Sequence, residues 1–209
     1  MKHRIFIAID LPPELKQRIS ETITQWRWLP IRWLAPASWH ITLVPAVYLE
    51  NSETETLLEL VHHSLPVPAR PARLPDGQAG GRQAGRFGKP FPVRFSRVVL
   101  APPGIQARMI WLEGDTPPEL VRLKKKIEAA WGQAPGGLPP LKRESRPLAL
   151  HITLARFEPG ELKELESKTH TLGEVDFRFE AQEVTVMESR LKPSGAEYER
   201  LAAVPLTVK

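Results

Sequence analysis

The chain of 209 residues contains six histidines, and two of them begin the same four-residue motif, HITL, at residues 40–43 and 151–154. The two copies lie about half a chain length apart, too far for the short period of a solenoid repeat. An imidazole titrates near neutral pH, so it can give or take a proton under physiological conditions. The repeat therefore predicts a protein of two related halves, each with one proton-transfer group.

The alternation within the motif predicts where its side chains point. Successive side chains of a β-strand lie on opposite faces, so isoleucine and leucine share one face while histidine and threonine share the other. We expect the aliphatic pair of each copy to be buried and the polar pairs, His40 with Thr42 and His151 with Thr153, to be open. If approximate two-fold symmetry relates the halves, the two polar pairs converge on one cleft.

Such a cleft suits the cleavage of a phosphodiester, in which the attacking and leaving oxygens lie in line with phosphorus. One histidine can take a proton from water while the other gives one to the leaving oxygen. The hydroxyls of Thr42 and Thr153 can donate to the non-bridging oxygens. Arg156 has the opposite strand parity from Thr153, but a bulge or the end of the strand could return its guanidinium to the phosphate.

The sequence gives weaker support to other roles of the two histidines. A single His-x-Thr is most often a surface pair, and it is the repetition that favours function. A metal site is a rival, but two histidines without a third ligand make a poor zinc set, and the chain has no cysteine. A serine hydrolase would need a nucleophile elbow, and Gly-x-Ser-x-Gly does not occur. We therefore expect neither a metal nor another cofactor.

Composition adds broad limits. Without cysteine, disulfides and thiol nucleophiles are excluded, and a formal net charge of +5 favours partners that carry phosphate. The apolar run from Ile5 to Ile9 is too short for a signal peptide, and no stretch approaches the length needed to span a membrane. These features predict a cytoplasmic protein with no membrane association.

The pattern of strands and helices favours an α+β fold with largely antiparallel sheets over a doubly wound parallel sheet, because several predicted strands are adjacent in sequence. A short helix is also expected around Leu162 and Leu165. The glycine-rich stretch at about residues 75–88 is predicted to be a flexible loop within a single domain, 1–209, with an arginine-bearing flap over the substrate as the alternative. The strands are expected at Arg4 to Ile9, Ile31 to Leu34, from Trp39, Val93 to Leu100, Ala107 to Glu113, from His151, Val175 to Phe179, Val184 to Leu191 and Tyr198 to Val208, and the main helices after Asp10, from Ser52 and from Pro117.

At this point the sequence resembles the two-histidine (2H) phosphoesterase superfamily, and within it the RNA 2′,3′-cyclic phosphodiesterases, also called 2′-5′ RNA ligases. The resemblance covers nearly the whole chain. It is carried by RIFIAIDLPPELKQRI near the start, IRWLAPASWHITL, HITLAR and the late ESRLKPSGAEYERL.

This resemblance implies a bilobal α+β fold with pseudo-two-fold symmetry and an active-site groove between the lobes. It also implies metal-independent hydrolysis of RNA 2′,3′-cyclic phosphate ends to 2′-phosphomonoesters. In that family the first histidine, here His40, is the proton donor and the second, His151, the proton acceptor, while Thr42, Thr153 and Arg156 hold the phosphate. Reversal of the reaction would join such an end to a 5′-hydroxyl.

Two departures from the family leave the substrate open. The first motif continues as Val44-Pro45-Ala46-Val47 instead of a Lys-Phe-Leu-Gly-like run, and the stretch from Pro75 to Gly88 looks inserted. We therefore keep two alternatives: a cyclic phosphodiesterase for small nucleotides such as ADP-ribose cyclic phosphate, and a non-catalytic RNA- or nucleotide-binding module. The expected partners are RNA or oligonucleotide ends with a 2′,3′-cyclic phosphate, or cyclic nucleotides, and a monomer is expected.

Overall fold

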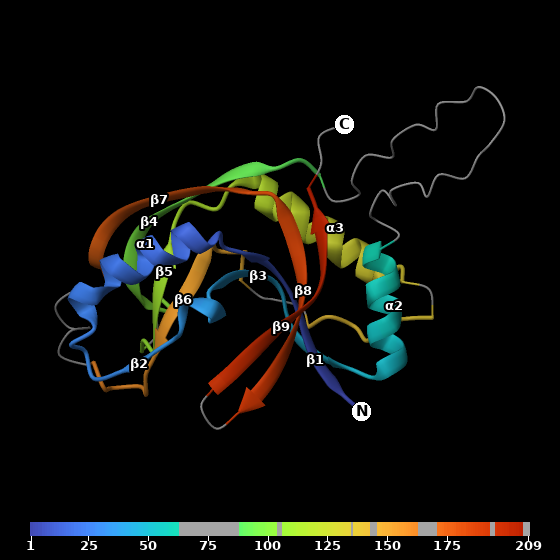
Figure 1. Cartoon of the computed structure of the whole chain (residues 1–209), viewed down its shortest axis with the longest axis horizontal. Coiled ribbons are helices and arrows are strands. Elements are labelled where there is room, and N and C mark those ends of the chain that lie inside the picture. The colour runs from blue at the N-terminus through green and yellow to red at the C-terminus, as the bar shows by residue number, and fades with distance from the viewer. Residues whose placement is uncertain are drawn as a thin grey trace.

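Two antiparallel sheets stand next to each other and carry one HITL motif each (Figure 1). The computed structural model describes residues 1–62, 88–103, 106–134, 136–142, 146–162, 171–192 and 195–206. The first sheet has the strand order β3-β1-β8-β9, with bounds β3 (His40–Leu49), β1 (His3–Asp10), β8 (Glu183–Lys192) and β9 (Gly195–Pro205). The second has the order β2-β6-β5-β4-β7, with bounds β2 (Arg32–Trp33), β6 (His151–Arg156), β5 (Met109–Glu113), β4 (Phe91–Ala101) and β7 (Thr171–Ala181).

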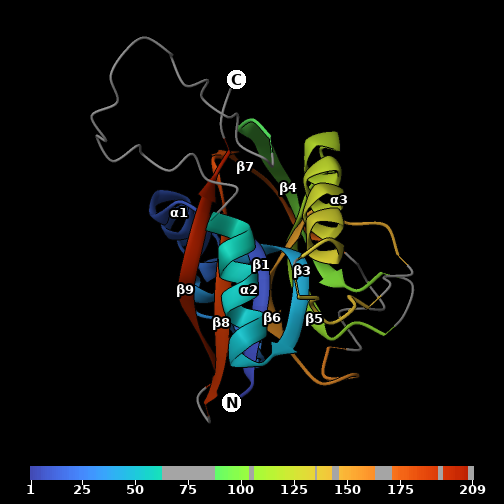
Figure 2. The same cartoon turned by 90° about the vertical axis from the view of Figure 1, so that its right-hand side faces the viewer.

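Helices lie outside the paired sheets, and α1 and α3 are on opposite sides of the molecule in Figure 2. Among the described residues they are α1 (Pro13–Ile23), α2 (Asn51–His62) and α3 (Pro118–Gly132), with short 3₁₀ turns at Thr24–Trp26 (η1) and Pro36–Ser38 (η2). No helix in the described part of the chain is long and apolar enough to cross a membrane. The predicted α+β class with antiparallel sheets is confirmed.

The two sheets correspond strand by strand when each is followed from its HITL strand. β3-β1-β8-β9 matches β6-β5-β4-β7, and every pairing between these neighbours is antiparallel. A second internal repeat supports the same match: Asp-x-Pro-Pro-Glu-Leu occurs at 10–15, before α1, and at 115–120, before α3. The carbonyls of Pro12 and Pro117 each accept a 3.0 Å bond from the third residue after them. The strand order therefore supports the predicted two-fold relation.

The aliphatic residues of both motifs lie in the core, as the alternation predicts. Leu43, Ile152 and Leu154 are fully buried and Ile41 nearly so. Full burial of such a side chain stabilises the fold by about 1.5–3 kcal/mol. One continuous cluster of buried residues includes strands of both sheets, so the halves share a hydrophobic core.

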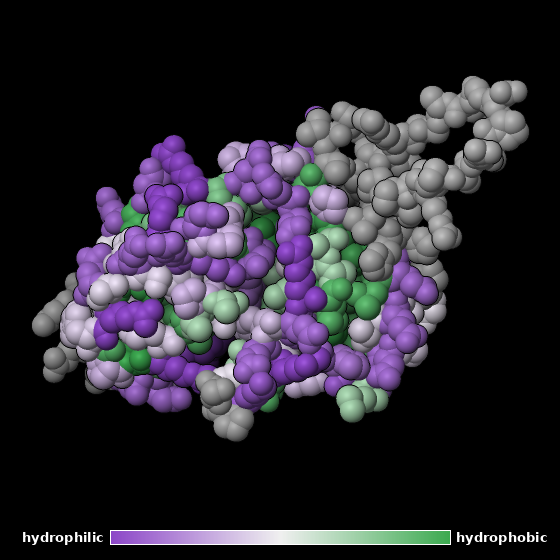
Figure 3. All heavy atoms as spheres, viewed as in Figure 1, coloured by the Kyte–Doolittle hydropathy of each residue, from purple (hydrophilic) through white to green (hydrophobic). Residues whose placement is uncertain are grey.

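Charged residues cover the outer face of the β8–β9 hairpin, which appears as a purple stripe in Figure 3. Ion pairs explain much of this stripe, including Lys192 with Glu197 at 2.6 Å and Arg200 with Glu183 at 2.6 Å. The hairpin surface therefore has largely balanced charge.

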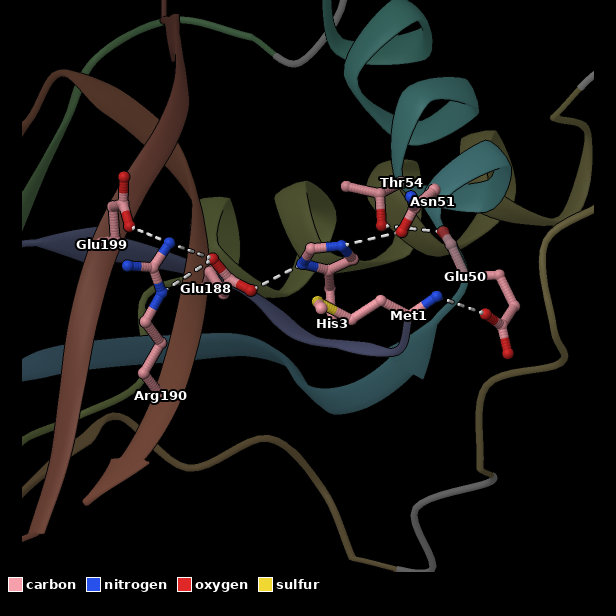
Figure 4. A network of polar contacts seen from close by, with 8 residues as sticks. All are labelled: Met1, His3, Glu50, Asn51, Thr54, Glu188, Arg190 and Glu199. Carbon is pink, nitrogen blue, oxygen red and sulfur yellow. Dashed lines mark hydrogen bonds and ion pairs between the residues drawn. The ribbon is translucent and has the colours of Figure 1, made fainter.

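A polar network joins the start of α2 to the first sheet (Figure 4). The His3 ring contacts the Glu188 carboxylate at 2.7 Å and the Asn51 side-chain oxygen at 3.0 Å. Glu188 also accepts from Arg190 at 3.1 Å. Because His3 lies on β1 and Glu188 on β8, the network fixes the first turn of α2 against two neighbouring strands.

Some expected elements differ from those observed. Leu162 lies in a turn instead of a helix, and Leu165 lies outside the described residues. Strand β9 begins at Gly195, earlier than expected, and ends at Pro205. Of the glycine-rich stretch, only Gly88 is described, so the predicted loop lies outside the described residues. Residues 159–162 form a turn, and the rest of the expected helix lies outside the described residues.

Candidate active site

Strands β3 and β6 bring the two motifs together where the sheets meet. β3 is an edge strand, and β2 pairs with β6 only at Ala155 and Arg156. The start of β6 is therefore not covered by β2, and β3 and β6 contact each other, lying side by side in both views (Figures 1 and 2). His151 is near enough for its charge to act on His40.

The two imidazoles are held by the same hydrogen bond. Nδ1 of His40 lies 2.9 Å from the carbonyl oxygen of Ser38, and Nδ1 of His151 lies 2.9 Å from that of Ala149. Because a carbonyl can only accept, Nδ1 carries the hydrogen in both contacts. Nε2 is then the nitrogen that gains or loses a proton in each ring, which is the arrangement that acid–base catalysis requires.

Each motif strand contains a β-bulge at the leucine of HITL. In both strands the threonine before this leucine and the residue after it pair with consecutive residues of the neighbouring strand, so Leu43 and Leu154 are the extra residues. Their carbonyls find other donors: Lys124 Nζ at 2.7 Å for Leu43 and the Leu34 backbone N–H at 2.8 Å for Leu154. The same bulge thus occurs in both motif strands, and the carbonyl of its extra residue has a hydrogen-bond donor in each.

This bulge places Arg156 on the same face as Thr153. Thr153 is opposite Trp111 and Arg156 is opposite Met109, and these two β5 residues share a face because they are two positions apart. The Arg156 guanidinium is exposed and touches the Met109 sulfur at 3.7 Å. The sequence allowed either a bulge or the strand's end to return this arginine; the structure has the bulge at Leu154, and Arg156 is also the last residue of β6.

Aromatic rings surround His40. Its ring centroid lies 4.7 Å from that of Phe6 and 5.2 Å from that of Tyr198, and the two aromatic rings are 4.9 Å apart. Phe6 comes from β1 and Tyr198 from β9, so three strands of the first sheet meet at this histidine. These rings remove water from one side of the imidazole.

Burial lowers the pKa of His40 to about 4, because the charged ring loses hydration. The bond to Ser38 and the charge of Asp10 favour the charged ring, whereas Lys16 and His151 oppose it. Asp10 is directly opposite His40 in the β1–β3 ladder, and its carboxylate accepts a 2.6 Å bond from Lys16. A carboxylate that is paired with a lysine therefore faces the first histidine.

His151 has a different neighbour set. Its ring stacks on Trp111, with centroids 4.0 Å apart and planes at 24°. Glu113 is directly opposite His151 in the β5–β6 ladder and forms a 3.0 Å ion pair with Arg97. Both histidines thus face an acid that is already bound to a base.

The structure places the sequence-predicted residues as follows. Thr42 and Thr153 are half-buried and Arg156 is exposed, and each threonine lies on the face of its own histidine. The described residues contain no group of three or more His, Asp or Glu side chains arranged for a metal ion. A hollow of about 610 Å³ lies elsewhere, along the second half of α3 and the loop that follows, and no motif residue lines it.

Sequence reasoning missed the aromatic residues and the acids at this site. Phe6, Tyr198 and Trp111 look like ordinary strand residues, because contacts between distant strands leave no sequence signal. Asp10 could have been found, since it opens the repeated Asp-x-Pro-Pro-Glu-Leu sequence. Glu113, which lies opposite His151 as Asp10 lies opposite His40, is two residues before the second copy.

Comparison with known proteins agrees with this fold. Residues 11–193 match the 2′-5′ RNA ligase superfamily. An RNA 2′,3′-cyclic phosphodiesterase of Methanocaldococcus jannaschii is 24% identical over 198 residues, which cover 94% of this chain and 96% of that protein. Among solved structures, E. coli LigT complexed with 3′-AMP has a TM-score of 0.71 at 20% identity, with all of both chains covered. TT0787 of Thermus thermophilus has a TM-score of 0.67 at 20% identity, with 97% of each chain covered.

The match over most of the chain shows that this protein belongs to the 2′-5′ RNA ligase superfamily. The family resemblance predicted from the two HITL motifs is therefore confirmed. The similarity to LigT and TT0787 shows that the fold is shared with these proteins.

Proposed function

We propose that the protein hydrolyses 2′,3′-cyclic phosphates at RNA ends to 2′-phosphomonoesters without a metal ion. The observation that carries the proposal is the repeated geometry of His40 and His151, each held through Nδ1 by a carbonyl two residues earlier. The family and the name of the Methanocaldococcus jannaschii relative support the same chemistry.

In the proposed reaction a water oxygen attacks phosphorus in line with O3′. Nε2 of His151 takes the proton of the water as its oxygen bonds to phosphorus. The P–O3′ bond breaks, and Nε2–H of His40 gives its proton to O3′. The hydroxyls of Thr42 and Thr153 and the guanidinium of Arg156 donate to the non-bridging oxygens, where negative charge increases. The reverse reaction would join the cyclic phosphate to a 5′-hydroxyl.

The low pKa of His40 sets a condition on this assignment. With a pKa of about 4, about one molecule in a thousand carries the proton on His40 at pH 7. A bound phosphate anion beside the ring favours the imidazolium and raises this pKa. His40 is therefore expected to take up its proton when the substrate binds.

Hydrolysis of a nucleoside 2′,3′-cyclic phosphate in the presence of EDTA tests the proposal. The expected result is release of the 2′-phosphomonoester at a rate that the chelator does not change. A purified, folded protein that binds the nucleotide without turnover would instead be the non-catalytic binding module. Comparison of RNA ends with ADP-ribose cyclic phosphate in the same assay distinguishes the small-nucleotide alternative.

A further inference from the structure

The sulfur of Met109 lies against the arginine of the candidate site. Met109 is the register partner of Arg156 in the β5–β6 ladder, and Nη1 of Arg156 donates to its sulfur at 3.7 Å. Met109 is partly exposed and Arg156 is exposed, on the face of the second sheet that also carries Thr153. Because a thioether sulfur is only a weak acceptor, this contact restrains the guanidinium little.

The first half of the molecule has other residue types at the two equivalent positions. Counted back from the acid opposite each histidine, the residue four positions earlier is Phe6 in β1 and Met109 in β5. The position equivalent to Arg156 in the first motif strand is Pro45. The thioether and the cation therefore occur together, in the half to which the proposed function gives the phosphate-holding guanidinium.

The oxidisable sulfur of this protein is methionine sulfur. The chain has no cysteine and three methionines, which are Met1, Met109 and Met187. Met187 is buried in the first sheet and Met1 is the exposed first residue, whereas Met109 is partly exposed at the candidate site. A hydroperoxide that enters the site therefore reaches the sulfur of Met109 more readily than that of Met187.

The reaction of this sulfur with a hydroperoxide is an oxygen transfer. A lone pair of the sulfur attacks one peroxide oxygen, the O–O bond breaks, and the proton of the transferred oxygen passes to the oxygen that leaves. The thioether loses two electrons and becomes a sulfoxide, while hydrogen peroxide is reduced to water. The guanidinium next to the sulfur can donate to the leaving oxygen, on which negative charge develops.

We propose that Met109 is an oxidative modification site whose sulfoxide holds Arg156 away from the substrate phosphate. The sulfoxide oxygen replaces the weak 3.7 Å sulfur contact by a charge-assisted hydrogen bond to the guanidinium. Arg156 then directs fewer donors towards the non-bridging oxygens, and the site binds phosphate-bearing ligands less tightly. The inference rests on the proposed function, because Arg156 contacts the reacting phosphate there.

Peptide mapping and calorimetry test the modification. The protein is treated with dilute hydrogen peroxide, the sulfoxide at each methionine is quantified by mass spectrometry, and binding of adenosine 2′-phosphate is measured before and after treatment. Met109 should be oxidised faster than Met187. The Kd for adenosine 2′-phosphate should rise about tenfold, as expected for the loss of a hydrogen bond to a charged group. Methionine sulfoxide reductases for both sulfoxide epimers should restore the original Kd.

Three variants show whether the effect passes through this sulfur and this guanidinium. Met109→Leu removes the sulfur, so peroxide should not change its Kd. Met187→Leu is the matched control and should respond to peroxide as the natural protein does. Arg156→Gln should bind adenosine 2′-phosphate more weakly, and peroxide should then change its Kd by less than about twofold, because the charged donor is absent.

Slower oxidation of Met109 than of Met187, or an unchanged Kd in protein oxidised at Met109, would overturn the proposal. A tenfold rise that persists in Met109→Leu or in Arg156→Gln would do the same. The binding measurements do not depend on turnover. A loss of affinity on oxidation without hydrolysis of any cyclic phosphate would therefore keep the modification site and reject the proposed reaction, and hydrolysis with an affinity that peroxide leaves unchanged would do the opposite.

Discussion

The two halves of the molecule use the same motif in different surroundings. In the first half the rings of Phe6 and Tyr198 lie against His40, and Pro45 lies two residues after the motif. In the other half His151 stacks on Trp111, and the residue equivalent to Pro45 is Arg156. The backbone contacts at Nδ1 and the bulge at the leucine are the same in both. The repeated backbone thus fixes the orientation of both rings, while the neighbouring side chains lower the proton affinity of His40 and give the second half its cation.

Replacement of the histidines tests the part of the site that the halves share. His40→Ala and His151→Ala should each lower kcat by about two to four orders of magnitude, because each removes one proton-transfer group. Rates of cyclic phosphate hydrolysis, with circular dichroism as the check on folding, provide the measurement. Near-normal turnover in either folded variant would assign the repeated motif to structure.

The threonines should show a smaller and more equal effect. Thr42→Ala and Thr153→Ala each remove one donor to the non-bridging oxygens, and a loss of about 10- to 1000-fold in kcat is expected. Thr→Ser at either position restores the hydroxyl and is the matched control. If the serine and alanine variants lost the same activity, packing of the methyl group would explain the effect instead of hydrogen bonding.

An NMR titration of His40 tests how the charges around it set its pKa. Asp10→Asn should lower its pKa further and Lys16→Met should raise it, because these charges act on the ring with opposite signs. In the natural protein, binding of a nucleoside 2′-phosphate should raise the pKa above its free value of about 4. Rates at neutral pH should change by less than about tenfold in either variant. A pKa that is unchanged by the bound phosphate would argue against His40 as the proton donor.

His3 provides a contrast within the same sheet and the smallest expected effect. Its hydrogen bond to Glu188 raises its pKa, whereas burial lowers that of His40. The contribution of His3 to stability should therefore be complete below pH 6.5 and decrease as pH rises through its folded-state pKa. The same bond lowers the pKa of Glu188, so the carboxylate's contribution is present above pH 4.5 and is lost as pH falls through its lowered pKa.

Thermal unfolding of His3→Gln checks this window. Near pH 5.5 the midpoint should fall by about 2–4 °C, which corresponds to about 1 kcal/mol, and the difference should shrink towards pH 8.5. Arg178→Gln, in an exposed ion pair far from His3, should show no such pH dependence. A difference that is constant across this range would indicate packing instead of the charged pair.

Local sequence patterns were enough to predict the class of the fold and to name five candidate site residues. Alternation placed Ile41 and Ile152 inside and Thr42 and Thr153 on the open face, because strand periodicity depends only on neighbouring residues. The bulge that brings Arg156 to the face of Thr153 could be predicted only as an alternative to the end of the strand, since a bulge depends on pairing with another strand.

The residues that surround the histidines could not be predicted in this way. Contacts between strands that are distant in sequence bring Phe6 and Tyr198 to His40. The register of β5 with β6 brings Trp111 to His151, and one sequence alone does not show which residues of two strands are paired. The helix expected around Leu162 and Leu165 stays a prediction, because only Leu162 of it lies within the described residues, where it belongs to a turn.

The two bulges differ in their mutational robustness. The carbonyl of Leu154 is satisfied by a backbone N–H, that of Leu34, so side-chain changes at residue 34 other than proline leave the donor in place. The carbonyl of Leu43 accepts from a side chain, that of Lys124, which comes from a helix of the other half of the chain. Over many generations of random substitution, the strand that carries His40 can therefore lose this donor through a single distant codon, whereas the strand that carries His151 is buffered against such loss.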